Sequence, residues 1–499
     1  MTCCLSLKKY FQTYAKTIFW TALFCILFAH GYAMCNLVGN NDTMGIISGY
    51  AGAGTSSGRW LLDILVKTCQ LLFGDVYFLP WFNLLLGFFL IACSAFLILY
   101  SFQAESKAAI VLVTALMIVF PAATSMALYG YTFHFNMLSL LLSVCCAALC
   151  LKANLLFHLL AAFLLALSLG IYQAYLPFTC AILVLSWIKN LSDGSSCKRV
   201  IRSILWDGAT ILLGLILYFS LTKLFCALFH ISLSSYRGID RMTVLPPFKS
   251  LLFSTAYSFG ILFLLPFKNL YGISTPLILR IMIFIYYLLS ILAVIHLYKK
   301  NTQGLTRKLL LTFLLFLLPP SSNLIFFMVN ADKDSVYTAM LYGTVAIFLF
   351  LPLFFQQSSL KPFTKRIICI TISGMVFLWG WFSNGVYTAS HHIIEQNIAV
   401  WNRIITEVES LDGYHSQMPV CIVGEHPYFP SVIESYDEFH HLVSLHYVVD
   451  WSLPHFLKNY LGWEKDFSSA PPSLPDNLPV YPDAGSIIIL DNVVIIHFK

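Results

Sequence analysis

The sequence predicts an α-helical protein that crosses a membrane many times and ends in a small α/β domain. Composition supports the membrane part, because 59% of the 499 residues are hydrophobic and only 10% are charged. A soluble domain usually has roughly 25% charged residues. Charge distribution supports the separate ending. Residues 1–384 hold 25 Lys and Arg against 9 Asp and Glu, whereas residues 385–499 hold 4 against 14.

We therefore expect a basic membrane domain over residues 1–384 and an acidic extracytoplasmic domain over residues 385–499. The net charge of +6 averages these unlike parts and shows no nucleic-acid footprint. The 14 cysteines include no CxxC pair, and most lie in apolar runs, where cysteine behaves as a small hydrophobic residue. The first apolar run lacks a small-residue cleavage pattern, so we expect an uncleaved first helix.

Hydropathy predicts about eleven membrane crossings, since a spanning helix needs about 20 apolar residues. Eight apolar runs approach that length, at 17–35, 76–101, 108–128, 204–230, 276–298, 309–328, 336–355 and 367–384. Three shorter runs lie at 137–151, 155–171 and 175–189.

The basic loops between these runs fall on one side of the membrane, which the positive-inside rule makes the cytoplasm. The N-terminus is then cytoplasmic, and the tail after residue 384 lies outside. The basic residues are Lys8, Lys9, Lys16, Lys107, Lys152, Lys189, Lys198, Arg199, Arg202, Lys299, Lys300, Arg307, Lys308, Lys361, Lys365 and Arg366.

Two further apolar stretches do not fit the count as crossings. Residues 251–267 lie between Lys249 and Lys268, and a crossing there would move the basic loop after residue 298 outside. We therefore expect a helix lying in the outer interface. Residues 58–73 look similar, with Asp63 and Lys67 four apart on a polar face. Such helices would form a platform for a lipid headgroup; the alternative is packed amphipathic loops.

The tail begins with a predicted helix over about 386–411, where apolar residues recur at helical spacing. Residues 418–424 (MPVCIVG) predict a strand. The closing run SIIIL-DN-VVIIHF predicts a hairpin that turns at Asp491 and Asn492.

The candidate chemistry begins in a polar stretch after the first helix, residues 36–60 (NLVGNNDTMGIISGYAGAGTSSGRW). Asp42 there is a candidate general base, and a helix cap or a solvated loop residue is the alternative. Arg59 is a candidate phosphate ligand, because its planar fork matches phosphate oxygens. The alternative is an arginine at the membrane interface.

Another candidate site is the turn Tyr172-Gln173-Ala174-Tyr175, between two short helices on the outer side. Its polar side chains suit sugar binding by hydrogen bonds and stacking. An aromatic belt explains the tyrosines equally well, but it does not explain Gln173.

The remaining candidates are charged residues on the same side. Lys223 lies late in an apolar helix, where a charge is costly and often functional, or snorkels to the surface. The loop SSYRGIDRM supplies Arg237, Asp240 and Arg241 as an anion or glycan site, or as a solvated loop. Arg280 at the start of the next helix is a further phosphate ligand candidate.

No P-loop, GxGxxG or HExxH motif occurs, and no histidine spacing matches a metal site. The cytoplasmic loops are short, so a nucleotide-dependent reaction has no place inside the cell. An activated sugar used outside must arrive on a lipid carrier.

The chain resembles the bacterial O-antigen-modifying, serotype-converting glucosyltransferases of the Gtr type, which have a GT-C-like membrane architecture. The resemblance rests on the first outer loop with its acid and GRW, on SLGIYQAYLPF, and on the tail from NRIITEV to PVCIVG. It implies transfer of glucose from undecaprenyl-phosphate-glucose to a surface polysaccharide repeat on the periplasmic face of the inner membrane. It implies no cofactor, with a flippase and a polyprenyl-phosphate glucosyltransferase as functional partners.

GT-C enzymes place a catalytic acid in the first outer loop, and Asp42 matches that place. Many such loops carry paired acids, whereas Asn41 is the neighbour here, so we expect metal-independent inversion by single displacement. In this interpretation the lipid phosphate is bound by Arg59, Lys223, Arg237, Arg241 and Arg280, and the sugar by Tyr172, Gln173, Tyr175 and Asp240.

Three alternatives stay open at the level of sequence. A lipid-linked oligosaccharide flippase or transporter needs a polar path, but apart from Lys223 the helix interiors hold almost no charge. An O-antigen polymerase and a non-catalytic envelope protein with a glycan-binding tail are the others. Turnover of the donor by purified protein separates them from the first interpretation.

Overall fold

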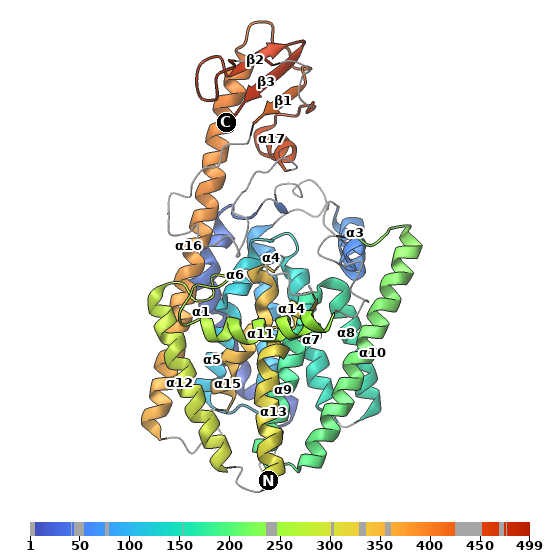
Figure 1. Ribbon diagram of the computed structural model, residues 1–499, viewed down its shortest axis with the longest axis vertical. Helices are drawn as coiled ribbons and strands as arrows, with labels where there is room; N and C mark the ends of the chain where they lie inside the picture. The colour runs from blue at the N-terminus through green and yellow to red at the C-terminus, as the bar shows by residue number, and fades with distance from the viewer. Residues whose placement is uncertain are drawn as a thin grey trace.

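The computed structural model describes residues 5–40, 42–43, 54–74, 79–152, 154–235, 247–300, 304–328, 336–354, 361–424, 452–468, 474–475 and 477–499. Long helices run side by side in a bundle, and a small domain stands beyond one end of it (Figure 1). The bundle helices are α1 (Leu7–Cys35), α4 (Pro80–Ser101), α5 (Lys107–Val119), α6 (Pro121–Ala127), α7 (Phe133–Cys150), α8 (Leu155–Ile171), α9 (Leu176–Ser192), α10 (Cys197–Phe229), α12 (Leu277–Lys300), α13 (Leu305–Ser322), α15 (Val345–Phe354) and α16 (Pro362–Glu409).

Shorter elements connect the bundle helices or lie across them. They are η1 (Thr55–Ser57), α3 (Trp60–Phe73), η2 (Gln173–Tyr175), α11 (Phe248–Leu264), α14 (Ile325–Met328) and η5 (Thr338–Thr344).

The prediction of a polytopic helical protein with a small C-terminal sheet is confirmed. Within the described residues, seven helices are long and apolar enough to cross a membrane, or eight if the bent pair α5–α6 is one span. Other apolar helices, such as α8, are shorter. The number of about eleven crossings therefore stays a prediction.

Different connecting segments lie at the two ends of the bundle. At the end where the chain begins, the Leu5 N–H donates to Gln103 Oε1 over 2.9 Å, and Arg307 donates to the Leu191 carbonyl. These bonds join connections that the sequence marks as basic. At the other end, the Gly39 N–H donates to Ser390 Oγ over 3.1 Å. The basic connections and the polar stretch that follows α1 thus lie at opposite ends.

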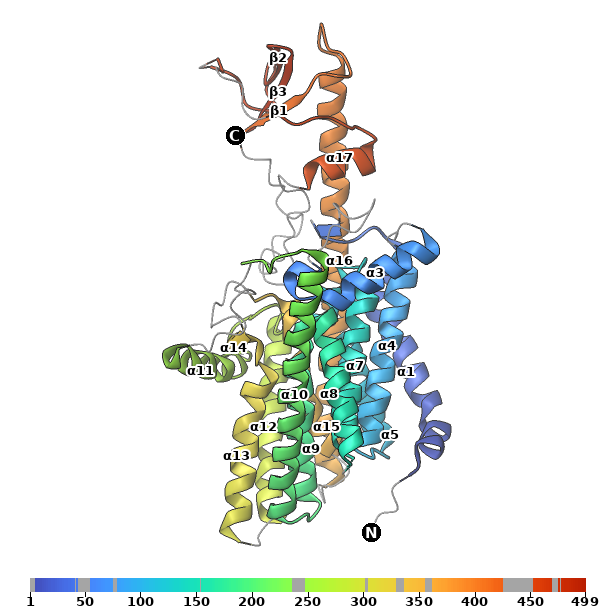
Figure 2. The ribbon, with the colours of Figure 1, turned by 90° about the vertical axis from the view of Figure 1, so that its right-hand side faces the viewer.

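α11 lies across the bundle instead of along it, as both views show (Figures 1 and 2). Large side chains on it are more than half exposed, including Phe248, Leu252, Phe253 and Phe263. An apolar helix with this exposure suits a membrane interface better than water. Figure 2 shows α3 lying across the end of the bundle as well.

The tail domain is built on α16, which runs unbroken for 48 residues and carries the chain out of the bundle. Its sheet has the order β1-β3-β2 and contains β1 (Val420–Val423), β2 (Ile487–Leu490) and β3 (Val493–His497). α17 (Leu453–Leu461) completes the domain. The predicted helix, strand and hairpin are confirmed. The division at residue 384 falls inside α16, and it stays a prediction.

Local chemistry explains how the tail hairpin turns. Asp491 and Asn492 connect the antiparallel strands β2 and β3 with φ values of +49° and +63°. A two-residue turn with both φ values positive matches the right-handed twist of its strands, and Asn and Asp tolerate that conformation better than most residues. The hairpin packs on α16, where the buried Trp401 ring lies 6.1 Å from the Phe498 ring.

We predict that α11 does not cross the membrane, so its two flanks lie on one side. Cysteines placed singly by Lys249→Cys and Lys268→Cys should both react in intact cells with a membrane-impermeant maleimide, with the parent chain as the blank. Both positions are exposed, so burial does not hide either one. Labelling of one position only after permeabilisation would show that α11 is a crossing.

Candidate active site

The residues before α3 form a compact turn that an acid holds in place. Backbone N–H groups of Ser57 and Arg59 both donate to the Gly54 carbonyl, over 2.9 and 3.0 Å. Asp63 Oδ2 accepts the Thr55 N–H over 2.8 Å and the Thr55 hydroxyl over 2.5 Å. Asp63 is only 8% exposed. The Asp63 carboxylate therefore holds the turn in place.

The prediction that Asp63 and Lys67 share a polar face of α3 is wrong. Asp63 faces the protein interior, while the Lys67 ammonium lies 4.6 Å from the centre of the Phe229 ring. The physical reason is that buried donors of the turn need an acceptor, and an unpaired buried donor costs more than an exposed ion pair returns.

Gln173 joins this turn to the bundle. Its side-chain amide donates to the Ser57 carbonyl over 2.8 Å and to Tyr218 Oη over 2.9 Å. Both partners are buried, as is Gln173 itself at 7% exposure. Gln173 lies in η2 and Tyr218 lies in α10, so one amide connects three segments that are far apart in the sequence.

Close packing fixes the GRW stretch as well. Gly58 has φ of +73°, and a Cβ there would lie 2.4 Å from Tyr218 Oη and 3.1 Å from Gln173 Nε2. The Trp60 ring stacks on Phe225 with centres 4.9 Å apart and planes 10° apart. A Cβ on Gly170 of α8 would lie 2.6 Å from the Trp60 ring. Only glycine fits at these two contacts.

Arg59 is the charged group that this packing presents. Its guanidinium carbon lies 4.9 Å from the centre of the Tyr172 ring, within the range of a cation–π contact. Arg59 Nε is buried and has no hydrogen-bond partner in the described part of the chain. No carboxylate forms an ion pair with it there. The guanidinium is thus held by an aromatic face and keeps a buried N–H available.

The tyrosines of the YQAY turn have different surroundings. Tyr172 is 6% exposed and supports Arg59, whereas Tyr175 is fully buried and packs 5.9 Å from the Tyr342 ring. Hydroxyls of α7 fix the turn from below: Ser139 donates to the Tyr172 carbonyl and Ser143 to the Tyr175 carbonyl, each over 3.2 Å.

Asp42 lies beside a residue that the structure ties to the bundle. The neighbouring Thr43 hydroxyl contacts the Asn40 side chain over 3.0 Å and the Leu128 carbonyl, at the end of α6, over 3.1 Å. Asp42 is half-buried. Its role as a base stays a prediction.

The other predicted phosphate ligands are more dispersed. Lys223 is exposed on α10. Arg280 Nη1 donates to the Phe267 carbonyl over 3.1 Å, beyond the end of α11. Arg237, Asp240 and Arg241 lie outside the described residues. The described chain just before them contacts the site, because the Ser234 N–H donates to the Ser56 carbonyl over 2.8 Å.

An apolar pocket of about 630 Å³ lies along α11. Its lining includes Phe253, Ala256, Gly260 and Ile261, with Lys249, Ser250 and Tyr257 as polar members.

Contiguous contacts link α11 to the YQAY turn. The Asn323 amide donates to the Ser258 carbonyl of α11 over 3.3 Å and accepts from the Thr344 hydroxyl over 2.8 Å. Thr344 closes η5, which also contains Tyr342, the ring neighbour of Tyr175.

Sequence reasoning missed Tyr218, Thr55 and Ser57. Tyr218 carried one usable signal, because a tyrosine in the middle of an apolar helix needs a hydrogen-bond partner. No sequence pattern marked Thr55 or Ser57, and Ser57 takes part only through its carbonyl oxygen.

A model of the glucosyl transferase GtrII family matches residues 31–350. The chain belongs to this family. The matched range contains every predicted site residue from Asp42 to Arg280 and ends before the tail domain. The suspected resemblance to Gtr-type glucosyltransferases is thereby confirmed. Neither the curated proteins nor the solved structures contain a match to the sequence of this GtrII protein.

We predict that Gly58→Ala destabilises this GtrII protein more than Gly462→Ala does. Both glycines have the left-handed conformation, with φ of +73° and +66° and ψ of 10° and 15°, so both substitutions add a similar backbone strain of about 1–2 kcal/mol. Only Gly58 lacks room, which adds an overpacking cost of about 1–3 kcal/mol. Unfolding midpoints in detergent measure the difference. Equal losses would contradict the tight packing, and adding Tyr218→Phe should recover part of the Gly58→Ala loss.

Proposed function

We propose that the protein transfers glucose from undecaprenyl-phosphate-glucose to an O-antigen repeat unit on the periplasmic face of the bacterial inner membrane. Membership of a glucosyl transferase family supports the transferred group. The state of Arg59 supports the donor class, because a buried guanidinium N–H without a protein acceptor suits a phosphate oxygen. This unpaired donor is the observation on which the proposal mainly rests.

A lipid donor needs an apolar binding surface near its phosphate. The pocket along α11 is lined mostly by apolar side chains, and the exposed apolar residues of α11 continue that surface. Contacts through Asn323 and η5 connect α11 with the YQAY turn. These features support a polyprenyl chain beside α11, with Arg59 at its phosphate.

The proposed reaction is a single inverting displacement. Asp42 takes the proton of the acceptor hydroxyl as its oxygen bonds to the anomeric carbon, and the bond from that carbon to the phosphate oxygen breaks. Undecaprenyl phosphate leaves with the electron pair. Arg59 stabilises the charge that develops on it, which is the electrostatic contribution expected to matter most.

The supporting residues divide this work. Tyr172 orients the Arg59 guanidinium through its ring. Gln173 donates both hydrogens of its side-chain amide to groups that fix the turn. Lys223, Arg280, Arg237 and Arg241 are further phosphate ligands in this proposal, and Asp240 is a sugar contact. Tyr175 is fully buried against Tyr342, so its part in this proposal is to support the turn. A flippase and a polyprenyl-phosphate glucosyltransferase would supply the donor from the cytoplasmic side.

We expect purified protein with acceptor glycan to consume undecaprenyl-phosphate-glucose and not a nucleotide-linked glucose. Arg59→Gln should lower kcat/KM for the lipid donor by roughly 10²–10³-fold, the usual loss of one transition-state donor. The unfolding midpoint should change little, because Arg59 Nε has no hydrogen-bond partner to lose and the cation–π contact with Tyr172 contributes only about 0.5–1 kcal/mol.

Arg403→Gln, on the exposed part of α16, is the matched control and should keep normal turnover. Efficient use of the nucleotide sugar would overturn the donor assignment. Near-normal turnover by Arg59→Gln would overturn the role of Arg59 alone.

Asp42→Asn should lower turnover by about 10²–10⁴-fold, the usual contribution of a general base, while expression and the unfolding midpoint stay near wild type. Asp412→Asn is the control, because Asp412 is exposed beyond the end of α16. Asp63 does not serve for this purpose, since its carboxylate supports Thr55. Normal turnover by Asp42→Asn would mean that another group takes the proton.

A further inference from the structure

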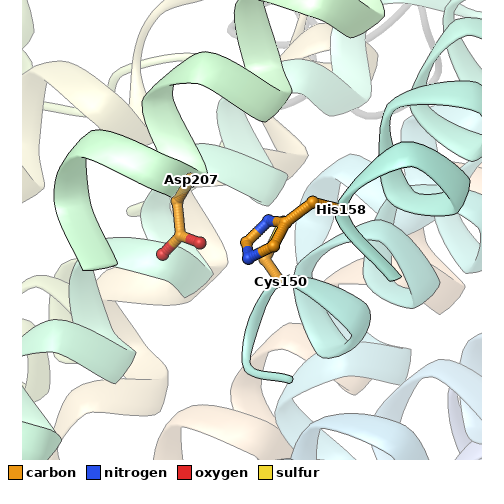
Figure 3. A group of neighbouring side chains, drawn as sticks. All are labelled: Cys150, His158 and Asp207. Atoms are coloured by element: carbon orange, nitrogen blue, oxygen red, sulfur yellow. The ribbon is translucent and has the colours of Figure 1, made fainter. Parts of the chain in front are cut away.

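A second polar cluster lies at the end of the bundle away from Arg59. Cys150 closes α7, His158 lies in the first turns of α8, and Asp207 belongs to α10. Their ligand atoms all lie within 4.8 Å of one another, and all three side chains are buried. Figure 3 shows the Asp207 carboxylate and the His158 ring facing one another, with Cys150 beside the ring.

Hydrogen bonds determine which nitrogen of His158 is available. His158 Nδ1 lies 2.8 Å from Thr210 Oγ1, and that hydroxyl lies 2.9 Å from the Trp206 carbonyl. The carbonyl only accepts, so the single hydroxyl hydrogen points to it. Nδ1 must then donate to Thr210, which leaves the lone pair on Nε2. A metal-binding histidine is usually oriented in this way through its second nitrogen.

Asp207 has a hydrogen-bond partner for one carboxylate oxygen but, among the described residues, none for the other. Its Oδ2 accepts from the Trp187 indole N–H over 2.7 Å. Its Oδ1 is buried and has no hydrogen-bond partner among the described residues, although Asp207 is only 2% exposed. A buried carboxylate oxygen without a partner is costly, and a bound cation removes that cost.

The surroundings offer an entry path and room for a fourth ligand. A pocket of about 650 Å³ is lined by all three residues. Lys198, Arg199 and Arg202 also line it, but their side chains are exposed, so water and salt screen their repulsion of a cation.

We propose that Cys150, His158 and Asp207 bind a divalent transition metal, with Zn²⁺ as the best match, and that water from the pocket completes a tetrahedral site. A thiolate, an imidazole and a carboxylate form a donor set typical of zinc. Ligand atoms around zinc lie roughly 3.3–3.8 Å apart, so binding draws these side chains together by about 1 Å. The Cys150 thiol releases its proton as the sulfur–metal bond forms.

The metal would connect α7, α8 and α10, and it would not take part in sugar transfer. His158 and Tyr172 are 14 residues apart along and just beyond α8, which corresponds to roughly 21 Å of helix. Failure of the metal-binding proposal would therefore leave the proposed function unaffected, and the reverse also holds.

The test uses full-length protein purified in detergent without a polyhistidine tag. After incubation with zinc and removal of the excess, wild type should retain about one equivalent by mass spectrometry of the metal. Cys150→Ser and Asp207→Asn should retain less than a tenth of that. Cys145→Ser, on the same helix but outside the cluster, should retain the wild-type amount.

Cobalt gives a second measurement, and its main readout is made on the wild-type protein. Cobalt-loaded wild type should show a thiolate-to-metal charge-transfer band, and Cys150→Ser should lose that band while Cys145→Ser keeps it. Absence of bound zinc and of the cobalt band in folded wild type would overturn the proposal. Equal metal content in wild type and Cys150→Ser would overturn it as well.

Discussion

The end of the bundle that carries α3 depends on one buried amide, the side chain of Gln173. It donates to the Ser57 carbonyl and to Tyr218 Oη, and so connects the turn before α3, the YQAY turn and α10. In an apolar bundle these groups have no water to bond instead. Loss of the amide would leave a buried carbonyl unpaired, so the position of Arg59 two residues later follows from this contact.

Packing around this contact then fixes the orientation of the Arg59 guanidinium. Gly58 lets the turn approach Tyr218, and Trp60 is enclosed between Phe225 and Gly170. The Arg59 guanidinium is left over the Tyr172 ring. An arginine held by an aromatic face loses less conformational freedom when it binds an anion than a free arginine does. The glycines and aromatics around Arg59 are thus part of its chemistry.

Sequence patterns predicted features that depend on neighbours along the chain. Two apolar runs on either side of Asp491 and Asn492 predicted the hairpin, and the lysines flanking residues 251–267 predicted that α11 lies across the bundle. Patterns failed where long-range packing decides. Asp63 looked solvent-facing by helical spacing, yet Thr55 draws it inward. Cys150 and Asp207 are 57 residues apart, and no spacing rule connects them.

The two ends of the bundle differ in the charge of their buried groups that have no hydrogen-bond partner among the described residues. In the described part of the chain, the Arg, Lys, Asp and Glu side chains with a buried, unpartnered polar atom are Arg59, Arg280 and Asp207. Both arginines lie on the side of α3 and α11, and the aspartate lies at the basic end. An apolar interior does not compensate a charge, so these groups support the ligands that we propose: a lipid phosphate at one end and a metal cation at the other.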